Sequence, residues 1–421
     1  MPGSLVGVHD DAAEDFSVTG RRTHVRFPFG RYLHPVGDDF VQVEIASGIV
    51  LFAAAAAALV VANMWTRAYT DLWTYEITFG TGALSITYDL RGWVNNGLMT
   101  LFFFVVGMEI KRELVEGELR DRRTAALPVV AAIGGMLVPA LIFLAWNPTG
   151  LASRGWGITT ATDLAFTLAV LALVAPRIPA GLRLFLLALA IVDDTGSVVI
   201  ITLFYSGHVE ISWMLAGMAV LLFLIAASRL RVPLQPLYVP LAFAALWFCT
   251  VKANLSGAVV GAVLGLITPA RSQDERHVLH RVEAPLHLVA SFAIVPLFAL
   301  ANAGIQLGLD DLRAAGSSGI TWAIVVARVV GKAVGITLAV ALAVRLGLGR
   351  LPPSVTRRQI LGVGVLAGIG FTVALFIADV AYDGTRLADA KIGILASAIA
   401  AGVLGTCFLL RSGGPTIPTG R

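Results

Sequence analysis

The chain has 421 residues, of which 57% are hydrophobic and 14% are charged, and its mean hydropathy is +0.82. Soluble domains contain about 25% charged residues, so this composition argues against a soluble protein and predicts one that is largely surrounded by lipid. The net charge of +4 does not indicate a nucleic-acid partner, because the basic residues are distributed as in a membrane protein, as described below.

The chain divides into a polar start, a long apolar middle and a short polar end. Residues 1–41 lack the apolar stretch of about 7–15 residues that a signal peptide needs, so we expect an N-terminal cytoplasmic tail, with a second tail at 411–421. Between them, stretches of about 20 apolar residues, enough to span a bilayer, predict an all-α polytopic membrane protein. The twelve expected spans are residues 42–64, 93–111, 125–146, 157–175, 181–204, 211–228, 235–250, 253–269, 285–303, 319–346, 359–381 and 390–410.

Lys and Arg indicate the orientation of these spans, because they accumulate in cytoplasmic loops. With the N-terminus inside, most basic residues outside the spans, such as those at 111–123 and 345–358, fall on the cytoplasmic side. The pattern therefore predicts a cell inner membrane protein with both termini in the cytoplasm.

The segment from about 73 to 90, on the outer side, has a β-strand pattern instead. Two β-rich runs, 74–79 and 83–88, flank the three-residue loop Gly80-Thr81-Gly82, which predicts a β-hairpin. An isolated hairpin is marginally stable in water. We expect it either to pair with the hairpin of a second copy in a homodimer or to pack on its own subunit.

Three ionisable sites lie deep inside expected spans, where a charge costs roughly 2.5–3.5 kcal/mol on insertion scales and usually has a function. The first is the pair Asp193-Asp194. Adjacent helical residues point about 100° apart, so one carboxylate can face a cavity while the other faces a helix. Two nearby carboxylates also resist joint ionisation, which makes the pair a candidate carrier of cations and protons. A buried, permanently paired carboxylate is the alternative.

The second site is Asp163, which follows a glycine and the threonines at 159, 160 and 162. These residues weaken a helix, and Thr and Asp can bond freed backbone groups, so we expect an interrupted span. An ordinary helix cap near the membrane surface is the alternative. The third site is Lys332, which is too far from either end of its span to reach the surface and needs Asp163 or Asp193 as its partner. Nearby Arg328 receives no role from the sequence.

Glycines interrupt a second span, at positions 362, 364, 368 and 370. Each weakens a helix by about 1 kcal/mol relative to alanine, and interrupted spans in corresponding halves of a chain mark transporter binding sites. The interrupted spans, the fourth and the eleventh, are the middle members of two triplets that run in opposite directions, which predicts an inverted repeat. Glycines that only allow close helix packing are the alternative.

The buried polar side chains are carboxylates and threonine hydroxyls, which suit hard cations. The sequence has no phosphate-binding glycine motif, so we expect neither ATP drive nor a cofactor. Three other functions stay open from these residues alone. An intramembrane aspartyl protease would need aspartates on separate helices, a retinal pump would use Lys332 as its Schiff base within seven spans, and an anion carrier fits poorly with two carboxylates.

The motifs ATDLAF at 161–166 and AIVDDTG at 190–196 resemble those of the bacterial NhaA family of Na⁺/H⁺ antiporters. Similar motifs follow the family's order at 101–104, 107–114, 131–136, 296–304, 331–332 and 368–372. The resemblance covers about residues 42–410.

The resemblance implies an electrogenic, pH-regulated antiporter that exchanges intracellular Na⁺ or Li⁺ for external H⁺, with crossed interruptions in spans 4 and 11 and a homodimer joined by the β-hairpin. It implies that Asp193 and Asp194 carry Na⁺ and protons and that Lys332 pairs with Asp193. Thr162 and Asp163 then lie at the crossing, where Asp163 balances the partial charges of helix ends. The charged cluster that the resemblance links to pH activation is Glu109, Arg112, Glu113, Glu283 and His287.

Overall fold

The computed structural model describes residues 38–117, 122–172, 179–205, 210–229, 238–268, 278–351 and 355–412. The two expected cytoplasmic tails, 1–41 and 411–421, lie almost entirely outside these residues.

Most of the described chain is helical, and strands occur only as one short pair within it. The first half contains α1 (Asp38–Met64), α2 (Thr66–Trp73), β1 (Glu76–Phe79), η1 (Gly82–Leu84), β2 (Ile86–Asp89), α3 (Leu90–Trp93), η2 (Val94–Leu98), α4 (Met99–Val115), α5 (Arg122–Trp146), η4 (Leu151–Thr159), α6 (Leu164–Ala172), α7 (Ala180–Phe204) and α8 (Ile211–Arg229). The second half contains α9 (Tyr238–Lys252), α10 (Gly257–Ile267), α11 (Val278–Val289), η6 (Ala290–Ile294), α12 (Val295–Asn302), α13 (Leu309–Ser317), α14 (Gly319–Val326), η7 (Ala327–Gly331), α15 (Lys332–Arg345), α16 (Arg357–Leu366), α17 (Thr372–Ala381) and α18 (Gly384–Arg411).

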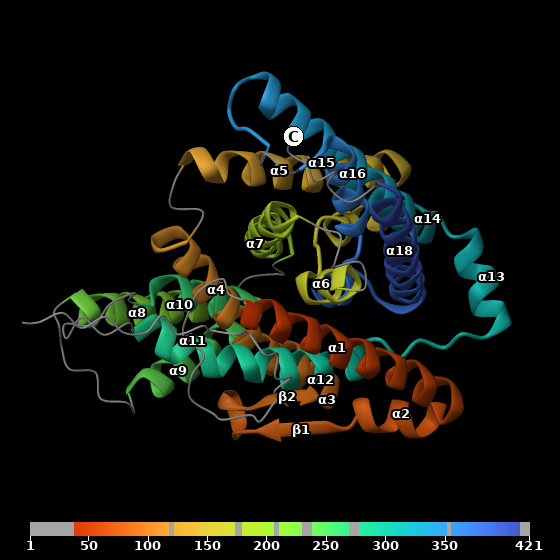
Figure 1. Cartoon of the computed structure of the whole chain (residues 1–421). Helices are drawn as coiled ribbons and strands as arrows, with labels where there is room; N and C mark the ends of the chain where they lie inside the picture. Colours follow the sequence, from red (N-terminus) through yellow and green to blue (C-terminus); the bar gives the residue numbers. More distant parts are fainter. Residues whose placement is uncertain are drawn as a thin grey trace, which may run out of the picture. The chain divides into compact units, whose positions relative to one another are not determined.

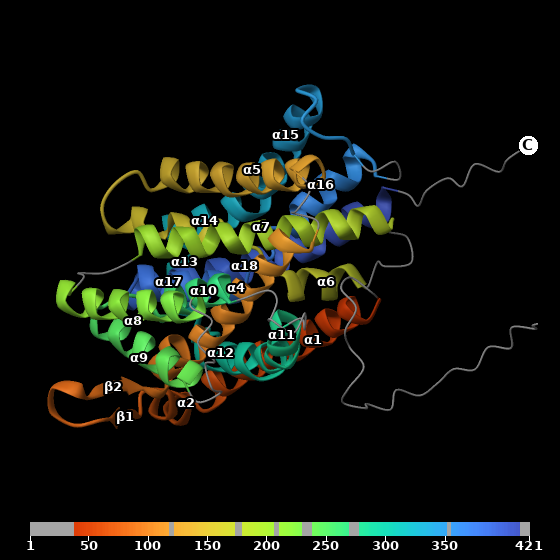
Figure 2. The same cartoon turned by 90° about the vertical axis from the view of Figure 1, so that its left-hand side faces the viewer.

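The helices form two groups (Figure 1). In one group α4 packs against α10 and α11, α9 against α8 and α10, and α1 against α12. In the other group α5 packs along α7 and α15, and α18 packs against α14 and α16 (Figures 1 and 2). The groups meet where α1 packs on α6, α4 on α7 and α12 on α17. The segments that carry Asp163, Asp194 and Glu109 lie at this meeting.

The apolar helices have the lengths expected of membrane spans. Among the residues that the structure describes, six helices are long and apolar enough to cross a bilayer: Gln42–Met64, Ala125–Trp146, Gly181–Phe204, Val282–Asn302, Gly319–Arg345 and Gly384–Arg411. Shorter apolar helices lie at Ile211–Ala226, Phe243–Lys252, Gly257–Ile267 and Thr372–Ala381. Each of the twelve expected segments contains helix. Large apolar side chains such as Phe52, Leu141 and Phe223 are more than 60% exposed, as expected where the solvent is lipid.

The predicted β-hairpin is present, but its connection is longer than expected. β1 pairs antiparallel with β2, and Phe79 lies opposite Ile86, so residues 80–85 connect the strands and the expected loop of three residues is wrong. A 3₁₀ turn over Gly82–Leu84 takes up part of the predicted second strand. Gly80 and Gly82 have φ values of 94° and 58°, which glycine adopts without steric strain.

The hairpin is fastened to its own subunit on one side. The Trp93 indole donates to the carbonyl of Ile77 at 3.0 Å, and Lys252 Nζ donates to the carbonyl of Ser85 at 2.7 Å. The alternative of packing on its own subunit is therefore met in part, while β1 stays mostly exposed.

Close contact between α5 and α15 depends on glycine. A Cβ at Gly335 would lie 2.2 Å from the carbonyl oxygen of Gly134, and a Cβ at Gly134 would lie 2.5 Å from that of Gly335. Small residues let helices in a membrane approach each other closely. This contact positions α15, and with it Lys332, against α5.

We predict that Gly335→Ala destabilises the protein by about 1–3 kcal/mol, the usual cost of adding a methyl group to a packed interior. The measurement is thermal unfolding of the purified protein in detergent. Gly316→Ala in α13 is the control, because a Cβ there has no neighbour within 4 Å. Equal melting temperatures for the two variants would contradict the prediction.

Candidate functional site

Two interrupted helices meet in the middle of the molecule. The helical segment η4 ends at Thr159 and α6 begins at Leu164, while α16 ends at Leu366 and α17 begins at Thr372. The non-helical segments between them touch, because the Asp163 amide donates to the Ile369 carbonyl at 2.8 Å. The interruptions expected from the threonines and from the glycines are both present, and the two lie against each other.

Asp163 bonds the amino-terminal ends of both half-helices at this crossing. Its carboxylate accepts from the amide of Phe166 at 3.0 Å in α6. It also accepts from the amide of Thr372 at 3.1 Å and from the Thr372 hydroxyl at 2.7 Å. A carboxylate is favourable here because the unpaired amides at a helix start carry partial positive charge. The alternative of a helix cap is thus half right, since Asp163 caps helices at the buried crossing.

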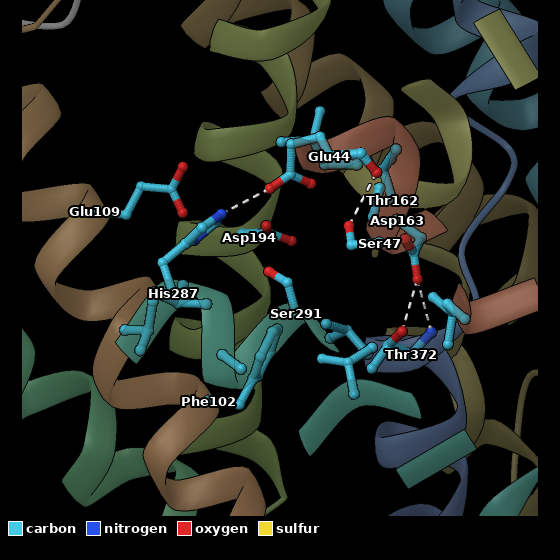
Figure 3. Close-up of a pocket in the computed structure, with 18 residues that line it drawn as sticks. Glu44, Ser47, Phe102, Glu109, Thr162, Asp163, Asp194, His287, Ser291 and Thr372 are labelled. Atoms are coloured by element: carbon cyan, nitrogen blue, oxygen red, sulfur yellow. Dashed lines mark hydrogen bonds and ion pairs between the residues drawn. The ribbon is translucent and has the colours of Figure 1, made fainter. Parts of the chain in front are cut away.

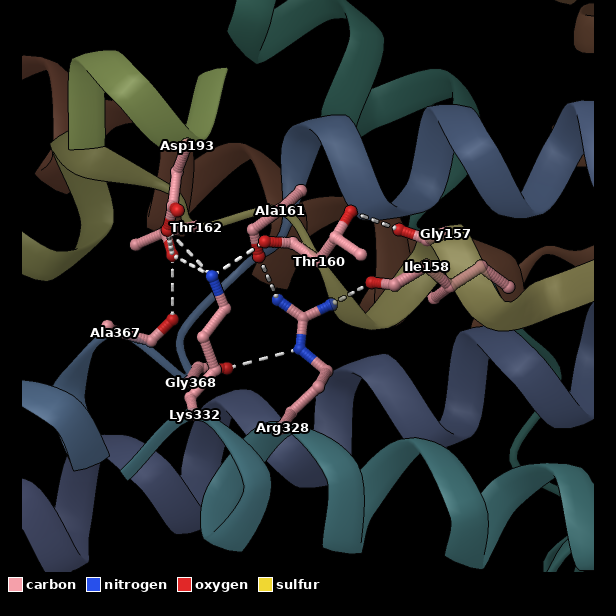
Figure 4. A network of polar contacts seen from close by, with 10 residues as sticks. All are labelled: Gly157, Ile158, Thr160, Ala161, Thr162, Asp193, Arg328, Lys332, Ala367 and Gly368. Carbon is pink, nitrogen blue, oxygen red and sulfur yellow. Dashed lines mark hydrogen bonds and ion pairs between the residues drawn. The ribbon is translucent and has the colours of Figure 1, made fainter. Parts of the chain in front are cut away.

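Lys332 and Asp193 form a buried ion pair beside the crossing (Figure 4). Lys332 Nζ lies 2.6 Å from Asp193 Oδ2, and both side chains are 0% exposed. Lys332 Nζ also donates to the Thr160 carbonyl at 2.6 Å and to the Thr162 hydroxyl at 2.9 Å. Of the two partners left open by the sequence, the structure brings Asp193 to Lys332, and Asp163 bonds helix ends instead.

The hydroxyl of Thr162 lies between the ion pair and the second interrupted helix. It is 2.7 Å from Asp193 Oδ2 and 3.0 Å from the Ala367 carbonyl. A hydroxyl has a single proton to donate, so it serves one of these acceptors at a time. The other carboxylate oxygen, Asp193 Oδ1, is buried and has no hydrogen-bond partner within the described residues.

Asp194 faces a cavity that Asp193 does not line (Figure 3). The cavity has a volume of about 80 Å³. The two neighbouring carboxylates diverge, as expected for adjacent residues of one helix. Asp194 is the only residue of α7 among those that line it. The polar residues of the lining are Glu44, Ser47, Glu109, Thr162, Asp163, Asp194, His287, Ser291 and Thr372.

The charged cluster on α4 and α11 lies at the same cavity. Arg112 bonds Glu283 and lies 3.8 Å from a carboxylate oxygen of Glu109 and 3.6 Å from one of Glu113. Glu109 lines the cavity together with His287. The structure therefore brings all five residues of the expected cluster to one region, next to Asp194.

The sequence interpretation missed Glu44, which lies on α1. Its carboxylate oxygen is 2.9 Å from His287 Nε2, and its side chain is 6% exposed. Glu44 is an acid at the start of its expected span, 42–64, so the criterion of depth that selected Asp163 did not find it. Thr372 and Ser291 were missed for another reason: an isolated hydroxyl in an apolar span is common and gains meaning only from its neighbours.

A second polar group joins Asn95, Asn302 and Asp379. Asn95 donates to Asp379 at 2.7 Å, and the Asn302 amide donates to Asn95 at 2.8 Å. These contacts join η2 and α12 to α17. The motif at 296–304 contains Asn302, but nothing in the sequence paired this residue with Asn95 or Asp379.

Two tyrosines from other parts of the chain bond the backbone of η4, the helical segment that precedes the first interruption. The Tyr382 hydroxyl donates to the Ala152 carbonyl, and the Tyr205 hydroxyl accepts from the Gly157 amide at 3.0 Å. Burial raises the pKa of Tyr382, in the connection between α17 and α18, to about 12. Its phenol therefore stays protonated and donating over the physiological pH range.

The sequence of this chain is similar to those of known proteins over most of its length. Residues 38–409 match the family model described as Na⁺/H⁺ antiporter 1. The Na⁺/H⁺ antiporter NhaA of Janthinobacterium sp. (strain Marseille) is 41% identical over 88% of this chain and 92% of its own length. The Na⁺/H⁺ antiporter NhaA 2 of Syntrophotalea carbinolica is 38% identical over 89% of this chain and 96% of its own length. The NhaA of Yersinia pseudotuberculosis (strain IP 31758) is 40% identical over 88% and 95%.

The family match covers both interrupted helices, the aspartate pair and Lys332. It excludes the protease, the retinal pump and the anion carrier, and it makes this multi-pass membrane protein a transporter and not an enzyme. The chain belongs to the Na⁺/H⁺ antiporter 1 family, whose curated members here are named NhaA.

Proposed function

We propose that this protein is an electrogenic antiporter of the cell inner membrane that exchanges intracellular Na⁺ or Li⁺ for external H⁺. The observation that carries the proposal is that the two aspartates have different surroundings. Asp194 faces a cavity, while Asp193 is paired with the buried Lys332. Asp194 is thus open to an entering cation, whereas Asp193 is paired with the Lys332 ammonium, which can release a proton.

Competition for one site couples the two ions. Na⁺ binds when Asp194 is ionised, and a proton displaces Na⁺ when it neutralises that carboxylate. The buried Asp193 Oδ1 has no hydrogen-bond partner in the described part of the chain, so it offers a second oxygen ligand. Carboxylate and hydroxyl oxygens suit a hard monovalent cation, and Na⁺ and H⁺ are substrates, not cofactors.

Electrogenic exchange follows if Lys332 gives up its proton when Na⁺ takes Asp193. The Lys332 ammonium and Na⁺ compete for the same carboxylate, and two cations cannot share it closely without repulsion. One Na⁺ then replaces one proton on Asp194 and one on Lys332. More protons than sodium ions would move in each cycle.

The proposed topology has twelve spans, counting the interrupted pairs η4–α6 and α16–α17 as one span each. The triplets α5 to α7 and α14 to α18 each have an interrupted helix in the middle, which supports an inverted repeat. Residues 42–410 form the antiporter domain, and both terminal tails lie in the cytoplasm. The cluster around Arg112 then faces the cytoplasm, and the contacts of Asn95 close the outer side.

We predict that Asp194→Asn abolishes Na⁺-dependent collapse of the pH gradient in everted vesicles. An amide keeps the size of the side chain but cannot bind a proton or balance Na⁺. Asp310→Asn in α13 is the control, because it removes a carboxylate whose side chain is 99% exposed. Unchanged exchange by the Asp194 variant would remove the basis of this proposal.

The second proposal is that Glu109, Arg112, Glu113, Glu283 and His287 regulate transport by pH. Their support is that they converge beside the cavity with Glu44. Titration of an acid or of His287 in this cluster changes the charge that an entering Na⁺ meets near Asp194.

We predict that Glu44→Gln moves the pH of half-maximal Na⁺-driven exchange toward acid. His287 lies 2.9 Å from this carboxylate, and an imidazolium without its counter-charge releases its proton at lower pH. The measurement is the pH profile of exchange in everted vesicles. Glu76→Gln, which neutralises an exposed acid in β1, should leave the profile in place; equal shifts in both variants would contradict this assignment.

The third proposal is a homodimer through the hairpin. It is supported by the exposed strand β1, because an uncovered strand edge can pair with another strand.

We predict that replacing Glu76–Asp89 by a short Gly-Ser linker converts a dimer into a monomer of about half the mass, measured by light scattering in mild detergent. Na⁺/H⁺ exchange should continue in the monomer, since every site residue described above comes from one chain. A dimer that persists without the hairpin would contradict the proposed interface.

A further inference from the structure

Arg328 is a fully buried arginine next to the proposed ion site. It lies in the π-helical turn η7, four residues before Lys332, and both side chains are 0% exposed. Its guanidinium makes no ion pair among the described residues. A buried charge needs strong compensation, so the contacts that it does make are informative.

Its side chain donates three hydrogen bonds to the described residues, and all three go to backbone carbonyls (Figure 4). Arg328 Nη1 donates to Ile158 at 2.9 Å and Nη2 to Ala161 at 3.0 Å. Arg328 Nε donates to Gly368 at 3.1 Å. The carbonyl of Ile158 lies in the last turn of η4, that of Ala161 just past the end of η4, and that of Gly368 just past the end of α16. One guanidinium therefore bonds the carboxyl-terminal ends of both half-helices.

These carbonyls are groups that a helix end leaves without amide partners, and they carry partial negative charge. Asp163 makes the reverse contacts with the amino-terminal ends of α6 and α17. The crossing thus has one fixed negative charge for its two helix starts and one positive charge for its two helix ends.

Glycines make the space that the guanidinium occupies. A Cβ at Gly370 would lie 1.6 Å from Arg328 Nη2 and 2.4 Å from the Ala161 carbonyl oxygen. A Cβ at Gly368 would lie 2.6 Å from the Arg328 carbonyl oxygen. The glycines that interrupt this span therefore fit the arginine as well as breaking the helix.

Lys332 makes a different set of contacts. It donates to one carbonyl, that of Thr160, and otherwise to Thr162 and Asp193. We propose that Arg328 is the fixed positive charge of the crossing, a positioning residue that neutralises both carboxyl-terminal helix ends and leaves Lys332 free to exchange its bond with Asp193 during transport. The inference rests on the proposed exchange of Na⁺ for H⁺ at Asp193 and Asp194.

The charge of Arg328 also acts on the ion site. Asp163 and Lys332 act on it electrostatically without an ion pair, and Lys332 bonds Asp193 on α7. The helix α18, which also packs on η7, carries Lys391. Removing the positive charge would let the carboxylates and Lys332 hold their protons to higher pH, and Na⁺ would then bind only at higher pH.

The test compares Arg328→Met and Arg328→Lys with the parent in everted vesicles, over pH and Na⁺ concentration. We expect Arg328→Met to move half-maximal exchange by about one pH unit toward alkali, the effect of a unit charge about 10 Å away at an effective dielectric near 20. Arg328→Lys keeps the charge but loses the guanidinium that bonds three carbonyls. Its pH profile should therefore stay near that of the parent, while its melting temperature falls. Arg345→Met, an exposed arginine at the end of α15, is the control for loss of a basic residue and should change neither quantity.

A purely structural role would lower the melting temperature of Arg328→Met and leave its pH profile in place, which would overturn the inference. If Arg328→Met does not fold, Arg328→Gln decides, because it removes the charge and keeps a donor for the helix-end carbonyls. The inference expects the same alkaline shift for Arg328→Gln, and an unshifted pH profile would overturn it. Asp194→Asn is measured in parallel, so that loss of the exchange proposal is distinguished from failure of the Arg328 inference alone.

Discussion

The structure depends on satisfying backbone groups inside a lipid-surrounded interior. No water is available there to bond free amides and carbonyls, so an interrupted helix is tolerated only where the protein itself supplies partners. Two interruptions placed against each other share those partners. Asp163 accepts from the amides of α6 and α17, and Arg328 donates to the carbonyls that end η4 and α16. The proposed ion site lies beside this junction, where Thr162, one of the threonines that break the helix, bonds Asp193.

In the proposed exchange, the buried pair of Lys332 and Asp193 resists separation unless another cation takes the place of the ammonium. Removing one partner from such a pair leaves an unpaired charge and typically costs about 3–5 kcal/mol. An entering cation that replaces the ammonium avoids this cost, whereas empty separation does not. This requirement favours exchange over leakage, because Lys332 can leave Asp193 readily only when another cation arrives.

The predictions from sequence were most successful where a residue type is costly in its location. Asp163, Asp193, Asp194 and Lys332 could be selected without a structure because an ionisable group inside an apolar span is expensive. Helix breaks at the threonines and at the glycines followed from propensity. Glu44 was missed because it lies at the start of its span, where a charge is less costly than at the centre. The hairpin connection was misjudged because a 3₁₀ turn over Gly82–Leu84 uses residues that also favour strands.

The sequence by itself determined the class of protein, the apolar segments, the two weak points in the helices and the charges that had to be buried, since all of these follow from local composition and the cost of polar groups in lipid. Only the tertiary structure decided the partners. Lys332 had two candidate carboxylates, and Arg328 had none until three carbonyls from two distant segments surrounded it. The physical reason is that a backbone carbonyl has no sequence signal. Which free helix end lies within 3 Å of a guanidinium depends on how helices far apart in the chain pack together.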